Sequence, residues 1–110
     1  MFTPLREKYI KELKEMSIEF TEDLPTWRED GFMYRAAFAN GYGISIVKHD
    51  GSYGREANKW EIAVLEKGKA EELKAYDLCY STPITCDVIG WLTGPEVMDY
   101  ARQIAELPAA

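Results

Sequence analysis

The dipeptide Asn40–Gly41 stands between two short runs of strand-forming residues, and this arrangement constrains the fold more than any other local feature. Both residues tolerate the positive φ angles of a type I′ turn, so the pair predicts a tight β-hairpin. Its strands are expected over residues 32–38 and 42–48. A third run, residues 60–65, alternates as a half-buried strand does. Strands joined by short links predict an antiparallel meander.

Amphipathic helices are expected before and after the strands. Thr3 and Pro4 suit the start of the first helix, as a capping residue and a proline at the first helical position, and the helix would end between residues 18 and 20. Its apolar stripe recurs at three- and four-residue spacing: Leu5, Tyr9, Leu13, Met16 and Phe20. The last helix follows Thr93-Gly94-Pro95-Glu96, which matches a capping box.

Weaker patterns fill the remaining segments. Residues 66–73 read as a polar connection that could hold a helical turn, and residues 75–80 as a fourth strand. Residues 81–87 are expected to form a loop, because Pro83 lacks the N–H group that a strand would donate to its neighbour. Residues 87–93 are expected to form a short helical turn.

The predicted fold class is therefore α+β, with a three- to four-stranded antiparallel meander packed against an N-terminal and a C-terminal helix. The 110 residues fit a single domain. Residues 1–30, a helix plus a loop, could pack on that domain or form an appended arm.

Charge narrows the classes of partner. The net charge of −6 argues against nucleic acid and against an anionic membrane surface, both of which select basic proteins. Residues 31–60 carry four Lys/Arg against two Asp/Glu, whereas the segments on either side are acidic. This distribution suits either an ordinary solvated surface or an acidic face that meets a basic protein.

Cysteine use and hydropathy indicate the compartment. Cys79 and Cys86 have neither zinc nor redox spacing, so no metal and no cofactor is expected. The first residues are too charged for a signal peptide, and no apolar run is long enough to span a membrane. The expected location is the cytoplasm, with reduced thiols.

Three segments together resemble a family. NGYGISIVKHDGSYG (residues 40–54), WEIAVL (60–65) and LCYSTPITCDVIGWLT (78–93) are similar in order and spacing to a family of small tailed-phage proteins of uncharacterised function. The chain departs from the family pattern at Ser81, at Cys86 and in a longer connection over residues 66–77. The resemblance implies a phage or prophage origin and action inside a bacterium, in the host cytoplasm. It transfers no activity and no catalytic residue.

The loop after the second hairpin strand holds His49 and Asp50, with Tyr53 close behind. A histidine beside an acid could act as a general base, and loops on rigid scaffolds often carry function. Neighbouring side chains on an extended segment point in opposite directions, however, so a histidine that shapes the turn is the plainer interpretation. No complete catalytic signature accompanies it, and the chain is not predicted to be an enzyme.

A second group of candidate binding residues combines hydroxyls and aromatics. Thr82 and Thr85, together with Ser81 and Asp87, suit either a polar recognition loop or the capping of the helical turn expected from residue 87. Capping is favoured, because an Asp at the start of a helical turn accepts from N–H groups that lack other partners. Tyr42 and Trp91 sit in or beside loop segments, and Tyr and Trp are enriched in interface hot spots. Cys79 alternates with its neighbours as a core residue would.

The leading hypothesis is a phage accessory protein that binds a host or phage protein, as a modulator or inhibitor of a host system. The first alternative is a homo-oligomeric structural protein that pairs through an exposed edge strand. The second is a small-ligand binder or enzyme that uses the loop from His49 to Tyr53.

Overall fold

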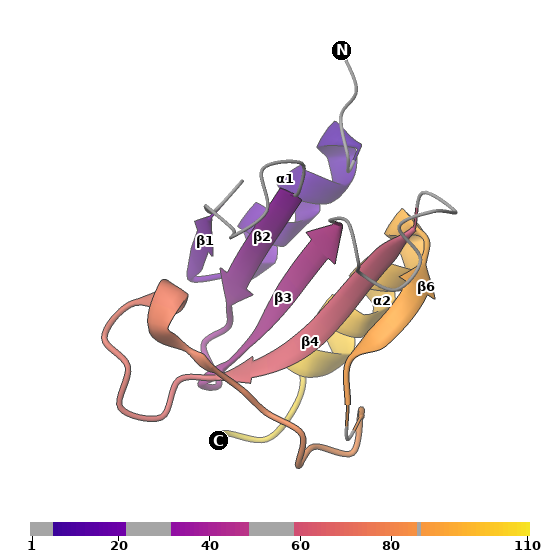
Figure 1. Ribbon diagram of the computed structural model, residues 1–110. Helices are drawn as coiled ribbons and strands as arrows, with labels where there is room; N and C mark the ends of the chain where they lie inside the picture. Colours follow the sequence, from indigo (N-terminus) through magenta and orange to yellow (C-terminus); the bar gives the residue numbers. More distant parts are fainter. Residues whose placement is uncertain (1–5, 22–31, 49–58, 86) are drawn as a thin grey trace.

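The computed structural model describes residues 6–21, 32–48, 59–85 and 87–110 (Figure 1). Within these ranges the chain forms two helices, one 3-10 turn and six strands. They are α1 (Glu7–Met16), β1 (Glu19–Thr21), β2 (Phe32–Ala37), β3 (Tyr42–Lys48), β4 (Trp60–Glu66), η2 (Leu73–Ala75), β5 (Asp77–Leu78), β6 (Ile89–Leu92) and α2 (Gly94–Ala105).

The sheet is an antiparallel meander. Its order is β1-β2-β3-β4-β5, and β6 also pairs with β4. All five pairings, including that of β6, are antiparallel. The α+β class is confirmed, with more strands than the three or four predicted, because the short strands β1 and β6 add to the meander.

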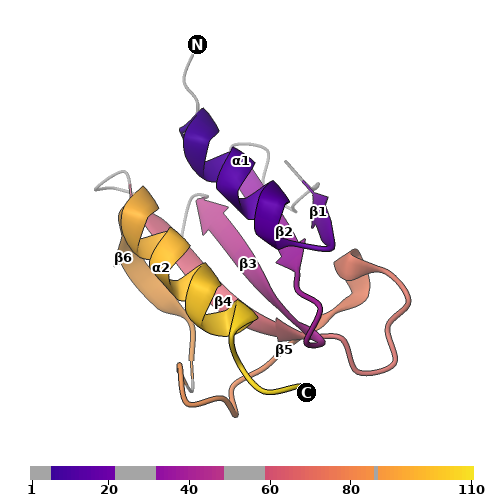
Figure 2. The ribbon, with the colours of Figure 1, turned by 180° about the vertical axis from the view of Figure 1, so that it is seen from behind.

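The two helices lie side by side on one face of the sheet (Figure 2). Leu13 of α1 is fully buried there, as are Val97, Ala101 and Ile104 of α2. They pack against alternate residues of the central strands, namely Tyr34, Ala36, Ile44, Ile46, Ile62 and Val64. The helix of residues 7–16 therefore shares one core with the sheet.

The first helix ends earlier than predicted. α1 stops at Met16, with Ser17 as its C-cap, and β1 pairs with β2 instead of continuing the helix. Phe20 still packs against the core, where its ring stacks on Tyr34 with centroids 6.2 Å apart. The apolar spacing correctly predicted that Phe20 contacts the core, but it wrongly predicted a helical backbone at this residue. Residues 19–21 pair with β2 as a strand, and this pairing replaces the last helical turn. Thr3 and Pro4 lie outside the described residues.

The hairpin between β2 and β3 is confirmed, but its turn is not type I′. Gly41 has a φ of 89°, whereas among the described residues Trp91 is the one non-glycine with positive φ, so Asn40 does not adopt the angle that type I′ requires. The amide of Gly41 donates to the carbonyl of Phe38 at 3.2 Å, and Phe38 pairs with Tyr42 at 2.9 Å. This is a three-residue loop that ends in a left-handed glycine.

The helical turn predicted over residues 87–93 is wrong: the chain forms β6 there. Ile89 lies opposite Ile62 and Leu92 opposite Trp60, along one edge of β4. Local sequence did not show this pairing, because the partner strand is more than 20 residues away. The fourth strand, predicted over residues 75–80, is the shorter strand β5. The helical turn that was expected within residues 66–73 forms slightly later in the chain, as η2.

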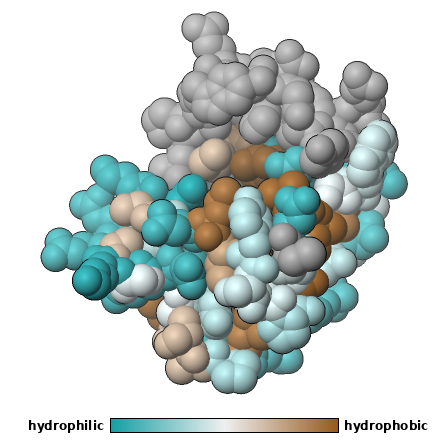
Figure 3. All heavy atoms as spheres, turned by 60° about the horizontal axis from the view of Figure 1, so that its bottom comes forward, coloured by the Kyte–Doolittle hydropathy of each residue, from teal (hydrophilic) through white to brown (hydrophobic). Residues whose placement is uncertain are grey.

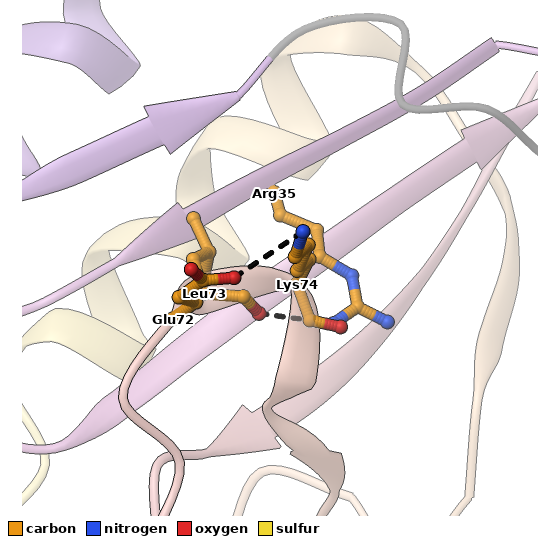
Figure 4. Close-up of polar contacts among 4 residues, drawn as sticks. All are labelled: Arg35, Glu72, Leu73 and Lys74. Carbon is orange, nitrogen blue, oxygen red and sulfur yellow. Dashed lines mark hydrogen bonds and ion pairs between the residues drawn. The ribbon is translucent and has the colours of Figure 1, made fainter.

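Residues 70–76 cover one end of the opposite face of the sheet. Ala37, Leu65, Leu73 and Tyr76 form a second buried cluster, with Ala70 packed against it. Arg35 of β2 holds this segment: its Nη1 donates to the carbonyls of Leu73 and Lys74 at 3.1 Å (Figure 4) and of Tyr76 at 3.3 Å. Burial of the guanidinium lowers the pKa of Arg35.

The start of α2 confirms the predicted capping box. The Thr93 hydroxyl accepts from the amide of Glu96 at 3.4 Å, and a Glu96 carboxylate oxygen accepts from the amide of Thr93 at 3.0 Å. These bonds to the backbone and the hydroxyl of Thr93 lower the pKa of Glu96. The cap fixes where β6 ends and α2 begins.

Candidate functional site

Among the described residues, one edge of the sheet carries three of the four large apolar side chains that are exposed. β5 pairs with the end of β4 at Leu65 and Glu66, and β6 pairs with its start at Trp60 and Ile62. The two short strands therefore share the same edge of β4, which is roughly 20 Å long at about 3.3 Å per residue. We call residues 77–85 and 87–92, which form this rim, the β5–β6 edge.

Trp91 lies at a break in the ladder. Between the pairs Ile62–Ile89 and Trp60–Leu92, β4 advances by two residues and β6 by three, so β6 holds an extra residue, as in a β-bulge. Trp91 has a φ of 63°, and its side chain is 57% exposed. A bulky residue in the left-handed region is a genuine outlier that costs about 1–2 kcal/mol.

Two further apolar side chains reach solvent on this edge. Leu78 is 50% exposed and Tyr80 44% exposed, while Cys79 between them is buried. In the part of the chain that the structure describes, Ile18 is the one large exposed apolar side chain away from this edge. Figure 3, which brings the bottom of the view in Figure 1 forward, shows hydrophobic residues at the surface among hydrophilic ones. The β5–β6 edge therefore concentrates exposed apolar side chains.

The connection between β5 and β6 is ordered by its own side chains. The Thr82 hydroxyl accepts from the amide of Ile84 at 3.3 Å. The Thr85 hydroxyl donates to the carbonyl of Asp87 at 2.7 Å and accepts from its amide at 3.0 Å. The Asp87 carboxylate accepts from the amide of Val88 at 2.7 Å, so it shapes the entry to β6 instead of capping the helical turn that was expected.

The predicted binding residues fall into three places. Thr82, Thr85 and Trp91 lie on the β5–β6 edge. Tyr42 begins β3 and packs, partly buried, against the core on the side of the helices. His49, Asp50 and Tyr53 lie outside the described residues, as does Cys86. Of the predicted binding residues that the structure describes, Thr82, Thr85 and Trp91 therefore share one edge, and Tyr42 lies elsewhere.

Sequence reasoning missed Leu78 and Tyr80 as surface residues, although a signal was present. The alternation of residues 78–80 predicted that Cys79 lies in the core, and the burial of Cys79 confirms this prediction. The same alternation places both neighbours on the other side, facing away from the core.

The described residues hold no group of three or more His, Cys, Asp or Glu side chains that could bind a metal ion. Within the same residues, neither helix has the length and apolar character needed to cross a membrane. Comparisons with protein-family models, curated proteins and solved structures give no match to this chain. The functional argument therefore rests on the geometry of the β5–β6 edge.

Proposed function

We propose that this protein acts by binding another protein through the β5–β6 edge. The observation that carries the proposal is Trp91, a large aromatic residue that occupies a left-handed bulge and is more exposed than buried. Trp and Tyr are the residues most enriched among those that dominate binding energy in protein interfaces.

The backbone at Trp91 supports this role. Glycine would adopt a φ of 63° without strain, and a polar residue would suit the exposed position better than an indole. The chain instead has a tryptophan here, a residue that is unfavourable for folding on both counts. Strained residues of this kind are found at binding and active sites, where the surrounding structure maintains the strain.

The resemblance to small tailed-phage proteins supplies the setting of the proposal. It suggests a phage or prophage accessory protein that acts in the cytoplasm of a bacterial host, as a modulator or inhibitor of a host system. Leu78 and Tyr80 would extend the contact from Trp91 along the edge of β4.

Affinity capture with paired variants tests the proposal. Tagged wild-type protein, W91A and I18A are incubated with a lysate of the bacterial host, and the retained proteins are identified by mass spectrometry. Both substitutions remove an exposed apolar side chain, but Ile18 lies away from the β5–β6 edge. We expect a dominant protein that wild type and I18A retain and W91A loses.

Self-association is the alternative that the same edge favours, because β6 lies at the rim of the sheet (Figure 1) and edge strands can pair with another copy. Light scattering over a range of concentrations separates the two. A monomer at all concentrations supports a different protein as the partner. A dimer that W91A converts to a monomer would replace the proposal with homo-oligomerisation.

A further inference from the structure

The β5–β6 edge lies in a segment without positive charge. Residues 75–101 contain no Lys and no Arg, but they contain Asp77, Asp87, Glu96 and Asp99. These four acids equal two thirds of the net charge of −6. The segment comprises β5, β6, the connection between them and most of α2; of its four acids, Asp77 and Asp87 lie on the β5–β6 edge and Glu96 and Asp99 on α2.

The two carboxylates on the edge itself belong to exposed residues, although one oxygen of Asp87 also accepts from the amide of Val88. Asp77 begins β5 and Asp87 precedes β6, and both residues are exposed. The ion pairs seen among the described residues, Lys74–Glu72 and Arg102–Glu12, involve neither of them. Asp77 and Asp87 therefore place negative charge on the same edge of β4 as the exposed side chains of Leu78 and Trp91.

The carboxylate of Glu96, at the start of α2, already has partners within the protein. Glu96 is occupied by the capping box, and Lys59 is close enough to contribute to the lowering of its pKa. The negative charge that a partner would meet is therefore that of Asp77 and Asp87, on either side of the connection between β5 and β6, and not that of the helix terminus.

Carboxylates on the same sheet edge as an exposed indole match a definite chemistry. Lys and Arg side chains pair with carboxylates, and their cationic groups also pack over the face of an aromatic ring, best of all Trp. Opposite charge speeds encounter and rejects wrongly charged partners. An acidic segment of a partner, or a nucleic acid, would meet like charge here.

We propose that the β5–β6 edge binds a basic segment of its partner, rich in Lys or Arg and carrying apolar side chains, with Trp91 and Leu78 as the apolar contacts and Asp77 and Asp87 as the charged ones. This inference rests on the proposed function, because it names the chemistry of the protein that the edge binds.

Two double variants with the same change in charge test the inference. D77K/D87K reverses the charge of the edge. E15K/E71K makes the same change in net charge at two other exposed acids, one on α1 and one before η2. Circular dichroism and thermal unfolding first establish that both fold. Affinity for the captured partner, and for overlapping synthetic peptides that cover its sequence, is then measured by titration.

We expect D77K/D87K to bind the partner at least about tenfold more weakly, and E15K/E71K to remain close to wild type. We also expect the peptides that bind to carry net positive charge, and their affinity to fall as salt is raised.

The outcomes separate this inference from the proposed function. If no protein is retained in a manner that depends on Trp91, the proposed function fails and the inference with it. If a Trp91-dependent partner is found but D77K/D87K binds as well as E15K/E71K, or the bound peptides are acidic, the inference alone is overturned.

Discussion

The side-chain amide of Asn40 donates to the carbonyl of Ile104 at 2.8 Å, and so joins the β2–β3 turn to the end of α2. The same nitrogen donates to the carbonyls of Leu107 at 3.0 Å and Ala105 at 3.3 Å, while the side-chain oxygen accepts from the amide of Tyr42 at 3.0 Å. One residue therefore shapes the turn and satisfies carbonyls that the last helical turn leaves without intrahelical partners.

Replacement of Asn40 tests this double role. N40A removes the donor and the acceptor together, and we expect it to lower the free energy of unfolding by about 1–3 kcal/mol. N40D keeps the acceptor for the amide of Tyr42 but places a carboxylate against the negative end of the helix dipole, so we expect it to be destabilised at pH 7 as well. Chemical denaturation measures both. An N40D protein as stable as wild type would show that the helix contact contributes nothing.

Gly43 is required in the middle of the meander by close approach, not by its φ angle. A Cβ added at Gly43 would lie 2.7 Å from the backbone oxygen of Ala36 and 3.4 Å from the ring of Tyr76. Since the backbone of a central strand cannot move aside, we expect G43A to cost about 2–3 kcal/mol.

Gly68 provides the matched control for G43A. It has a φ of 52°, and an added Cβ would meet no atom within 4 Å. We therefore expect G68A to cost only about 1 kcal/mol, from the left-handed backbone alone. Thermal or chemical unfolding ranks the two variants, and equal losses would argue against tight packing between β2, β3 and Tyr76.

A comparison of two substitutions at Trp91 measures the strain in its backbone. W91G and W91A both remove the indole and differ only in a Cβ at a φ of 63°. Glycine usually destabilises a strand relative to alanine, but here we expect W91G to be more stable than W91A by about 1 kcal/mol.

The same pair separates folding from binding. W91G should lose the partner as completely as W91A does, although it folds at least as well. Unfolding curves that place W91A above W91G would show that the left-handed geometry carries no cost, and would remove the main support for a functional role of Trp91.

Glu96 makes stability depend on pH in the acidic range. Its folded pKa is lowered below the ordinary value of 4.5 by the hydrogen bonds to Thr93. The charged Glu96 side chain therefore contributes to the free energy of unfolding when the pH is above the ordinary pKa. This contribution is lost as the pH falls through the lowered pKa of the folded protein. We expect the stability difference between wild type and E96Q to shrink as the pH falls below about 4. A difference that stays constant from neutral to acidic pH would contradict the role of the charged capping box.

Local patterns were reliable where the determining contacts are close in sequence. The capping box at Thr93 and Glu96 joins residues three apart, and the hairpin at Gly41 joins adjacent strands, so both could be predicted. The burial of Cys79 followed from alternation along a few residues. In each case the sequence pattern and the final contacts concern the same short segment.

The candidate site was only partly predictable, because the contacts that form it join segments that are far apart in the sequence. Trp91 was predicted from the sequence to be a binding residue, a prediction that stays untested. Its place in a strand and in a bulge was not predicted, because its conformation depends on the register between β6 and β4. Asp77 and Leu78 were not recognised at all. Their exposure on the same edge as Trp91 depends on two short strands that share one neighbour.

The sequence by itself determined the α+β class, the hairpin, the start of the last helix and the acidity of the segment after residue 74, since periodicity, turn chemistry and charge are properties of neighbouring residues. The tertiary structure alone decided that residues 89–92 form a strand, that Asn40 caps α2, and that Arg35 holds the turn at Leu73. Each of these joins residues more than 20 positions apart, and a contact of that kind exists only once the chain has folded.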